Sequence, residues 1–239
     1  MRVLVTRPEP DAVYEAEQIA ARGHQPVLAP LLHIEFCKAA LPLAGAYGLI
    51  VTSRNALRAL AVHPDRATAS MLPLYAVGGA TAEAAWDLGF AEVTAGPGTA
   101  KGLAALIMRD VAPEWGPLVH LAGDTLAFDL AAALGAHGFT VRKAVLYRAV
   151  PAKALPPEAV ALIASGRPKR VVLMSPQTAS TFAALIAKHG LVTQARSLVC
   201  YCLSEAVAEA VTPLGCEIRV AAYPREEDIL ALLDAETAS

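Results

Sequence analysis

The sequence predicts an α/β fold of two related parallel-sheet domains, each with helices on both faces of its sheet. Two observations carry this prediction. Short apolar runs alternate with Ala-rich segments of helical spacing, a rhythm typical of parallel strands joined by crossover helices. Several stretches also recur later in the chain in the same order.

Six short apolar runs have the length of buried strands, and each is followed by a segment of helical periodicity. The predicted strands are Val3–Val5, Gly48–Thr52, Leu74–Val77, Leu118–Leu121, Arg170–Met174 and Leu198–Leu203. The predicted helices are Ala12–Arg22, Asn55–Ala61, Thr81–Leu88, Thr125–His137, Gln177–Lys188 and Glu205–Leu214.

The internal repeat links three pairs of stretches: Leu74–Ala84 with Cys200–Ala210, Leu49–Ser53 with Val171–Ser175, and Val3–Arg7 with Leu118–Ala122. Three collinear matches favour a duplication over chance similarity between Ala-rich helices. About three β-α units per half are expected, which is unlike the many short repeats of a solenoid.

Composition narrows the possible partners. The chain has 239 residues, is 55% hydrophobic and has a net charge of −2 without a basic stripe, which argues against nucleic acid. No run of eighteen apolar residues exists, so no membrane span is expected. The apolar start is too short for a signal peptide, which favours a cytoplasmic protein.

The four cysteines include Cys200 and Cys202, which alternation places on one face of a predicted strand. A zinc site needs further ligands at suitable spacing, and the nearest histidine, His189, lies beyond a loop. Buried thiols are therefore the expectation, with metal or redox chemistry as the alternative.

Predicted strands end in small polar residues that open helices. These places are Thr6-Arg7-Pro8, Thr52-Ser53-Arg54-Asn55, Gly78–Thr81, Gly123-Asp124-Thr125, Ser175-Pro176-Gln177-Thr178 and Ser204. Helix capping explains such residues, and so does a ligand, because ligands of parallel sheets bind outside the carboxyl ends of the strands. Helix N-termini facing a cleft between the two halves would suit a ligand with many negative charges.

Few cationic or catalytic groups accompany these strand ends. Serine-hydrolase, P-loop and zinc-protease signatures are absent from the sequence. Arg7 and Arg54 are the arginines that stand out. Tyr147 is the one hydroxyl in the extended connector Leu146–Pro151, which matches Pro30–Phe36 in the other half. Packing of the tyrosine ring is the alternative to a role in chemistry.

A longer series of short motifs occurs in a familiar order: Val5-Thr6-Arg7-Pro8, Val51-Thr52-Ser53-x-Asn55-Ala56, Ala76-Val77-Gly78-x-x-Thr81-Ala82, a turn at Gly123, Val145-Leu146-Tyr147, Met174-Ser175-Pro176 and Leu203-Ser204. Over essentially the whole chain this order resembles bacterial uroporphyrinogen-III synthases. Each motif is weak by itself, and their order and spacing carry the resemblance.

The resemblance implies a domain layout and an activity. One discontinuous domain would comprise residues 1–35 and 151–239, another residues 37–145, with connectors near 30–36 and 146–151. The reaction would be that of a cyclising hydro-lyase in haem-type tetrapyrrole biosynthesis. It would close hydroxymethylbilane, a linear tetrapyrrole with eight carboxylates, with inversion of ring D and loss of water. A non-enzymatic two-domain ligand-binding or sensing protein is the alternative.

The same resemblance implies the site. Tyr147 would assist departure of the substrate hydroxyl, and no metal or organic cofactor would be needed. The expected partner is this small molecule, without nucleic acid or membrane, and the chain is expected to be a monomer. The implied substrate-binding residues are Arg7, Ser53, Asn55, Gly78, Thr81, Gly123, Ser175, Pro176 and Ser204.

Overall fold

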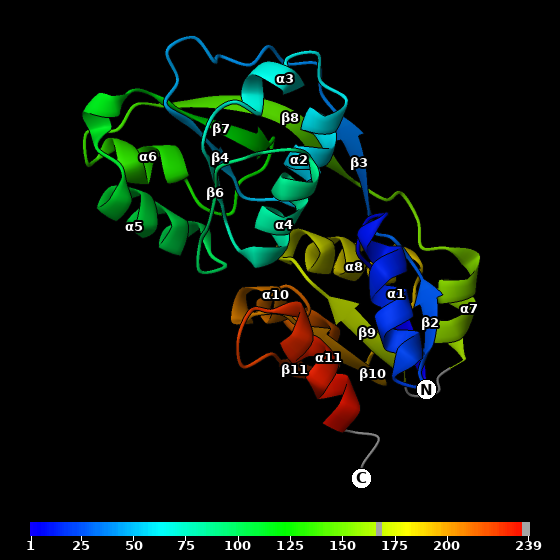
Figure 1. Cartoon of the computed structure of the whole chain (residues 1–239). Helices are drawn as coiled ribbons and strands as arrows, with labels where there is room; N and C mark the ends of the chain where they lie inside the picture. Colours follow the sequence, from blue (N-terminus) through cyan, green and yellow to red (C-terminus); the bar gives the residue numbers. More distant parts are fainter. Residues whose placement is uncertain (166–168, 236–239) are drawn as a thin grey trace. The chain divides into compact units, whose positions relative to one another are not determined.

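The computed structural model describes residues 1–165 and 169–235. The chain divides into two compact units. The discontinuous unit comprises Met1–His33 and Val150–Ser239, and the continuous unit is Ile34–Ala149. Each unit is built on its own sheet (Figure 1).

The sheet of the discontinuous unit has five strands in the order β11-β10-β9-β1-β2. They are β1 (Arg2–Val5), β2 (Gln25–Leu28), β9 (Lys169–Leu173), β10 (Leu198–Cys202) and β11 (Glu217–Val220). All four neighbouring pairs are parallel. The N-terminal strand β1 therefore lies between β9 and β2, inside a sheet otherwise built mostly from the second half of the chain.

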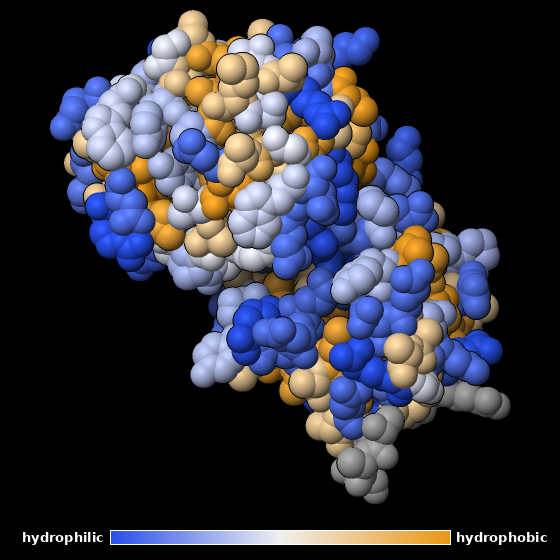
Figure 2. Space-filling model, in the orientation of Figure 1, coloured by the Kyte–Doolittle hydropathy of each residue, from blue (hydrophilic) through white to orange (hydrophobic). Residues whose placement is uncertain are grey.

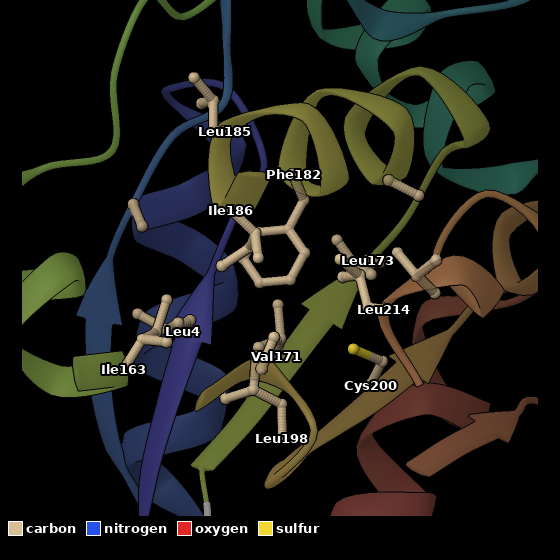
Figure 3. Packing of buried hydrophobic residues seen from close by; sticks show 14 of the residues in the cluster. Leu4, Ile163, Val171, Leu173, Phe182, Leu185, Ile186, Leu198, Cys200 and Leu214 are labelled. Carbon is tan, nitrogen blue, oxygen red and sulfur yellow. The ribbon is translucent and has the colours of Figure 1, made fainter. Parts of the chain in front are cut away.

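Helices cover both faces of this sheet. Leu4 of β1 belongs to a core that includes Phe182 and Ile186, whereas Val3 and Val5 face a second core. Figure 3 shows Phe182 and Ile186 beside Val171 of β9 in the first core. Because both faces are buried, these strands are continuous apolar runs. The helices of the unit are α1 (Asp11–Ala21), α7 (Pro157–Ala164), α8 (Pro176–Lys188), α9 (Val192–Ala195), α10 (Glu205–Glu209) and α11 (Glu226–Ala235), with a 3₁₀ turn at Thr212–Leu214.

The sheet of the continuous unit has six strands in the order β3-β8-β7-β4-β5-β6. They are β3 (Leu32–Phe36), β4 (Gly48–Val51), β5 (Leu74–Ala76), β6 (Val93–Ala95), β7 (Leu118–Gly123) and β8 (Val141–Pro151). The strands from β8 to β6 pair in parallel. Its helices are α2 (Arg54–Ala61), α3 (Arg66–Ala69), α4 (Gly79–Asp87), α5 (Ala100–Asp110) and α6 (Leu130–Gly135), with a 3₁₀ turn at Pro113–Trp115.

The two sheets repeat one strand order. The order β11-β10-β9-β1-β2 corresponds to β6-β5-β4-β7-β8, and the stretches matched in the sequence fall on β10 and β5, β9 and β4, and β1 and β7. Gly23, between α1 and β2, and Gly138, between α6 and β8, occupy corresponding places in the two units, and both have a positive φ, 78° and 86°. Glycine is the residue that adopts this conformation without a steric cost. The shared topology supports the internal duplication.

The α/β class with parallel sheets is confirmed, but two predicted helices are too long. The predicted helix Thr125–His137 is helical only over Leu130–Gly135, because Asp129 starts it by accepting a hydrogen bond from the Ala132 amide at 3.0 Å. In place of the predicted helix Glu205–Leu214, the α-helix ends at Glu209. Proline at position 213 disfavours continuation, because its ring clashes with the preceding turn.

Apolar residues on the surface are scattered among polar ones in the view of Figure 2. Large exposed apolar side chains include Val62, Met71, Trp86, Trp115 and Tyr223. None of the helices in the described part of the chain combines the length and the apolar character that crossing a membrane requires.

Candidate functional site

The carboxyl ends of the parallel strands β7, β4 and β5 share one edge of the continuous unit's sheet. Gly123 ends β7, Ser53 follows β4, and Gly78 follows β5. Three of the residues predicted for substrate binding therefore lie along this edge, which we call the carboxyl edge of the continuous unit.

Ser53 is the N-cap of α2. Its backbone is extended, and its Oγ accepts a hydrogen bond from the amide of Asn55 at 3.2 Å. The Asn55 carbonyl oxygen Oδ1 accepts from Arg58 Nη1 at 2.6 Å, within the same helix. Both polar side chains thus take part in starting α2, as the capping interpretation predicts.

Gly78 and Thr81 open α4. A Cβ at Gly78 would lie 3.1 Å from the Cα of Gly98, so close backbone packing explains the glycine at this position. Gly78 gives the helix no side-chain cap. Thr81 is buried, whereas Gly79 and Ala80 directly before it are exposed. The backbone amides of this turn are therefore its more accessible donors.

Tyr147 comes to the carboxyl edge because β8 contains a bulge. Ala122 pairs with Val145, but the next residue, Gly123, pairs with Tyr147, so Leu146 is the extra residue. A bulge of this kind redirects the side chains that follow it. The amide of Asp124 donates to the Tyr147 carbonyl at 3.0 Å and holds the two strands together beyond the bulge.

The tyrosine ring extends over Gly123 toward Ser53. A Cβ at Gly123 would lie 2.9 Å from Cζ of Tyr147 and 3.0 Å from its hydroxyl oxygen. Because β7 lies between β8 and β4, only a residue without a side chain leaves room for the ring to reach the Ser53 side chain. A hydrogen bond between the side chains of Tyr147 and Ser53 is one of the influences on the pKa of Tyr147.

Burial raises the pKa of Tyr147 above its ordinary value of 10.0, and the charge of Asp124 raises it further. The hydrogen bond with Ser53 acts in the opposite direction. The phenol therefore keeps its proton at neutral pH and can donate a hydrogen bond, although it is a weak acid.

A second carboxyl edge belongs to the discontinuous unit, where β10, β9 and β1 are parallel neighbours. Ser175 follows β9 and is the N-cap of α8, with its Oγ accepting from the Thr178 amide at 3.1 Å. Pro176 occupies the first helical position, where its missing N–H costs nothing. Ser204 follows β10 and starts α10, but among the described residues its side chain makes no capping hydrogen bond.

Arg7 follows β1 at the same edge, and its guanidinium is bound by acidic side chains. Nη1 lies 2.8 Å from Glu226 of α11, and Nη2 lies 3.3 Å from Asp11 of α1. The side chain is only 14% exposed. Arg7 thus ties two helices to the end of a strand, which is a structural role that the sequence did not reveal.

Two further groups near these edges were not among the predicted site residues. His120 of β7 is buried with Nε2 at 3.3 Å from Thr52 Oγ1, and burial, aided by Lys143, lowers its pKa to about 4. Glu15 of α1 is fully buried, and burial is the main reason that its pKa rises to about 8. Both residues stand at positions where the periodic pattern of the sequence places core residues, and only their polarity distinguishes them from the apolar residues around them.

Cys200 and Cys202 are buried, as expected, and neither forms a disulfide. Over residues 1–165 and 169–235, no three His, Cys, Asp or Glu side chains are grouped so that they could hold a metal ion.

Comparison with known proteins gives a consistent family. Residues 15–231 match the family described as uroporphyrinogen-III synthase HemD. The fold is similar to that of the uroporphyrinogen-III synthetase of Helicobacter pylori 26695, with a TM-score of 0.69, 18% identity, and coverage of 100% of this chain and 99% of that one. It is also similar to a mutant uroporphyrinogen III synthase of the extremely thermophilic bacterium Thermus thermophilus, with a TM-score of 0.58, 18% identity and the same coverage. No significant match is found among curated proteins. The family match spans most of the chain, and the chain therefore belongs to the uroporphyrinogen-III synthase family, cyclising lyases of tetrapyrrole biosynthesis.

Proposed function

We propose that this chain closes hydroxymethylbilane to uroporphyrinogen III, with inversion of ring D and loss of the terminal hydroxyl as water. The observation that carries the residue assignment is the arrangement of Tyr147 over Gly123 beside Ser53. It places a protonated phenol at the carboxyl edge of a parallel sheet, where ligands of such sheets bind.

Substrate binding is assigned to the strand-to-helix turns. Carboxylates are favoured at helix N-termini, because free amide groups and the helix dipole both point toward the ligand. The turns at Ser53, at Gly78–Thr81 and at Ser175-Pro176 supply such termini, and Ser204 adds a hydroxyl that no capping bond uses among the described residues. A substrate with eight carboxylates can use several of these turns. Asn55 and Gly123 support this set by shaping the α2 turn and by leaving room for Tyr147.

Arg7 has a different place in the proposal. Its pairs with Asp11 and Glu226 partly neutralise the guanidinium, so a substrate carboxylate would have to compete with two protein carboxylates. We assign Arg7 to organising the carboxyl edge of the discontinuous unit, and direct substrate binding by Arg7 remains a prediction.

Chemistry is assigned mainly to positioning. The pyrroles of the substrate supply the electrons that expel the hydroxyl, so the protein's task is to hold the substrate so that the substituted carbon of ring D attacks. Tyr147 donates a hydrogen bond to the departing hydroxyl, and its raised pKa keeps the proton available for that bond. No metal or organic cofactor is part of this proposal.

The test is incubation of the purified chain with enzymatically generated hydroxymethylbilane, followed by separation of the I and III isomers of the product. We expect the type III isomer in proportion to the amount of chain, and type I alone in the sample without it. Type I alone in both samples would overturn the proposal. We also propose that the chain acts as a cytoplasmic monomer, and light scattering coupled to gel filtration tests the monomer.

A further inference from the structure

A cluster of thiols lies in the discontinuous unit, away from the carboxyl edge described above. Cys200 belongs to β10, and Cys216 directly precedes β11, the parallel neighbour of β10. Their sulfur atoms are 3.4 Å apart. Figure 3 shows the side chain of Cys200 in the core beside Leu214. Leu214 ends the 3₁₀ turn Thr212–Leu214, two residues before Cys216.

The two thiols differ in access. Cys200 is fully buried. Cys216 is half-buried, and its chain neighbours Gly215 and Glu217 are exposed. A small oxidant from solvent therefore reaches Cys216 first, and Cys200 is the sulfur waiting behind it.

The two thiols also differ in acidity. The hydrogen bond between the sulfur atoms lowers the pKa of Cys216, against the opposing effect of its burial. The same hydrogen bond and burial raise the pKa of Cys200. The contact between the two sulfur atoms can stabilise one thiolate, the reactive form of cysteine, and solvent access favours Cys216 as its position.

We propose that Cys216 and Cys200 form an oxidation site, at which a hydroperoxide converts the two neighbouring thiols into a reversible disulfide.

The chemistry takes two balanced steps. The Cys216 thiolate attacks the hydroperoxide, an S–O bond forms, the O–O bond breaks, and the departing oxygen takes up a proton and leaves as an alcohol or as water. The Cys200 thiol then attacks the sulfenic acid on Cys216, an S–S bond forms, the S–O bond breaks, and the thiol proton leaves with the hydroxyl as water. The two thiols supply the two electrons that reduce the peroxide. Rotation of the side chains must bring the sulfur atoms from 3.4 Å to the bond length of about 2.0 Å.

Cys202 is a natural control because it is buried on the same strand, in the same core as Cys200. Its Sγ lies 3.8 Å from the carbonyl oxygen of Cys200, and burial raises its pKa to about 12. Cys37 is half-buried in the continuous unit and is a second control. Neither thiol is expected to enter the disulfide.

The experiment treats the full-length chain with hydrogen peroxide under native conditions, blocks the remaining thiols, and maps linked peptides by mass spectrometry with and without dithiothreitol. We expect a peptide pair joined through Cys200 and Cys216 that reduction separates, and a higher thermal unfolding midpoint for the oxidised chain, because the bond closes the loop between them. Cys202→Ser and Cys37→Ser should leave the linkage unchanged. Cys216→Ser should abolish it, and Cys200→Ser should stop at a sulfenic acid that dimedone traps on Cys216.

Circular dichroism of each variant before oxidation shows that it is folded, and Cys→Ala replaces any Cys→Ser variant that is not. The proposal is overturned if the wild-type chain yields no linkage between Cys200 and Cys216. It is equally overturned if dimedone labels Cys202 or Cys37 in preference to Cys216 in the Cys200 variant.

Discussion

At the scale of single residues, the candidate site depends on three residues from three neighbouring strands. Tyr147 comes from β8, Gly123 ends β7, and Ser53 follows β4. The glycine is needed because the phenol extends across the position that its side chain would fill. Sequence inspection singled out all three residues separately, but the bulge that brings the tyrosine to the edge has no local sequence signal and depends on the pairing of β7 with β8.

Replacement of Tyr147 by Phe separates chemistry from packing. The ring keeps its contacts, so the free energy of unfolding should change by about 1 kcal/mol or less. We expect kcat for type III product to fall roughly 10²-fold, the lower end for loss of an acid catalyst. Stopped assays with isomer separation and urea unfolding measure the two effects. A Phe variant with full kcat and an unchanged isomer ratio would leave the tyrosine with a packing role.

Replacement of Gly123 by Ala tests the position of the same ring. The new methyl group would lie 2.9 Å from Cζ of Tyr147, so the ring must move. We expect a loss of kcat comparable to that of Tyr147→Phe. The double variant should be little worse than either single variant, because one change displaces the phenol hydroxyl and the other deletes it. Gly135→Ala is the matched control, since a Cβ there meets nothing within 4 Å. Fully additive losses in the double variant would count against coupling between the two residues.

At the scale of helices and strands, the buried inner strands were predictable, whereas three edge strands and the helices α5, α7 and α11 were not. The strands β1, β4, β5, β7, β9 and β10 are continuous apolar runs because helices cover both faces of each sheet. The strands β2, β6 and β11 were missed. They are short and partly exposed, β2 contains Pro26, and such segments carry little periodicity. The polar turns were recognised, but capping and ligand binding use the same residue types, so only the structure shows which hydroxyls are already engaged.

The caps of α8 and α10 allow these two roles to be separated. Ser175→Ala removes the 3.1 Å bond to the Thr178 amide and should lower the free energy of unfolding by about 1 kcal/mol. Ser204→Ala removes no capping bond among the described residues, so its effect on unfolding should stay within about 0.5 kcal/mol. If Ser204 binds a substrate carboxylate, its kcat/KM should still fall about tenfold. Unfolding and initial-rate measurements on both variants provide the comparison, and an unchanged kcat/KM for Ser204→Ala would remove Ser204 from the binding set.

The buried carboxyl group of Glu15, on α1, predicts a pH-dependent stability. Burial, with help from Glu226 and Asp11 and against Arg7, raises the pKa of Glu15 from its ordinary value of 4.5 to about 8. Between these values the unfolded chain releases a proton that the folded chain keeps, so stability is present in full below about pH 4.5 and is lost as the pH rises toward 8. The loss is on the order of 5 kcal/mol.

Glu15→Gln imitates the protonated side chain and should remove this dependence. We expect the variant to gain stability relative to the wild type as the pH rises from about 5 to about 8. Urea unfolding at several pH values measures the difference, and the titration of His120 is common to both proteins and cancels. Glu17→Gln, at an exposed position of the same helix, should leave the wild-type profile unchanged. Parallel profiles for Glu15→Gln and the wild type would show that Glu15 titrates alike in the folded and unfolded states.

At the scale of the whole molecule, the chain forms two units with corresponding strand orders, and one of these units is built from two separate segments of the chain. The two sheets share one strand order, but β1 and β2 of the discontinuous unit precede the continuous unit in the chain and β9 to β11 follow it. The repeat was visible in the sequence because strands and turns were matched in order. The discontinuous domain layout was predicted only from the resemblance to a family. Apolar periodicity identifies strands, but it does not say which sheet each strand joins.

We propose that each unit is an independent folding domain, and the chain path makes this testable. The amide of Ala152 donates to the carbonyl of Leu31 at 2.9 Å, so the two ends left by removing residues 32–151 lie side by side. A chain in which a short Gly-Ser linker joins Leu31 to Ala152 should therefore form the discontinuous unit alone, with a cooperative thermal transition.

The matched control is a fragment of residues 152–239 without the N-terminal segment. Strand β1 is an inner strand of the sheet, between β9 and β2, and its Leu4 and Val5 are buried. Without it, β9 loses one of its two partner strands and the helices on both faces lose core contacts, so the fragment should give no cooperative transition in circular dichroism or calorimetry. Addition of a peptide of residues 1–31 should restore the transition in a concentration-dependent way, as expected for a ligand that binds only the folded state. A cooperative transition of the fragment alone would mean that β1 is dispensable, and its absence from the linked chain would mean that the discontinuous unit needs the rest of the molecule to fold.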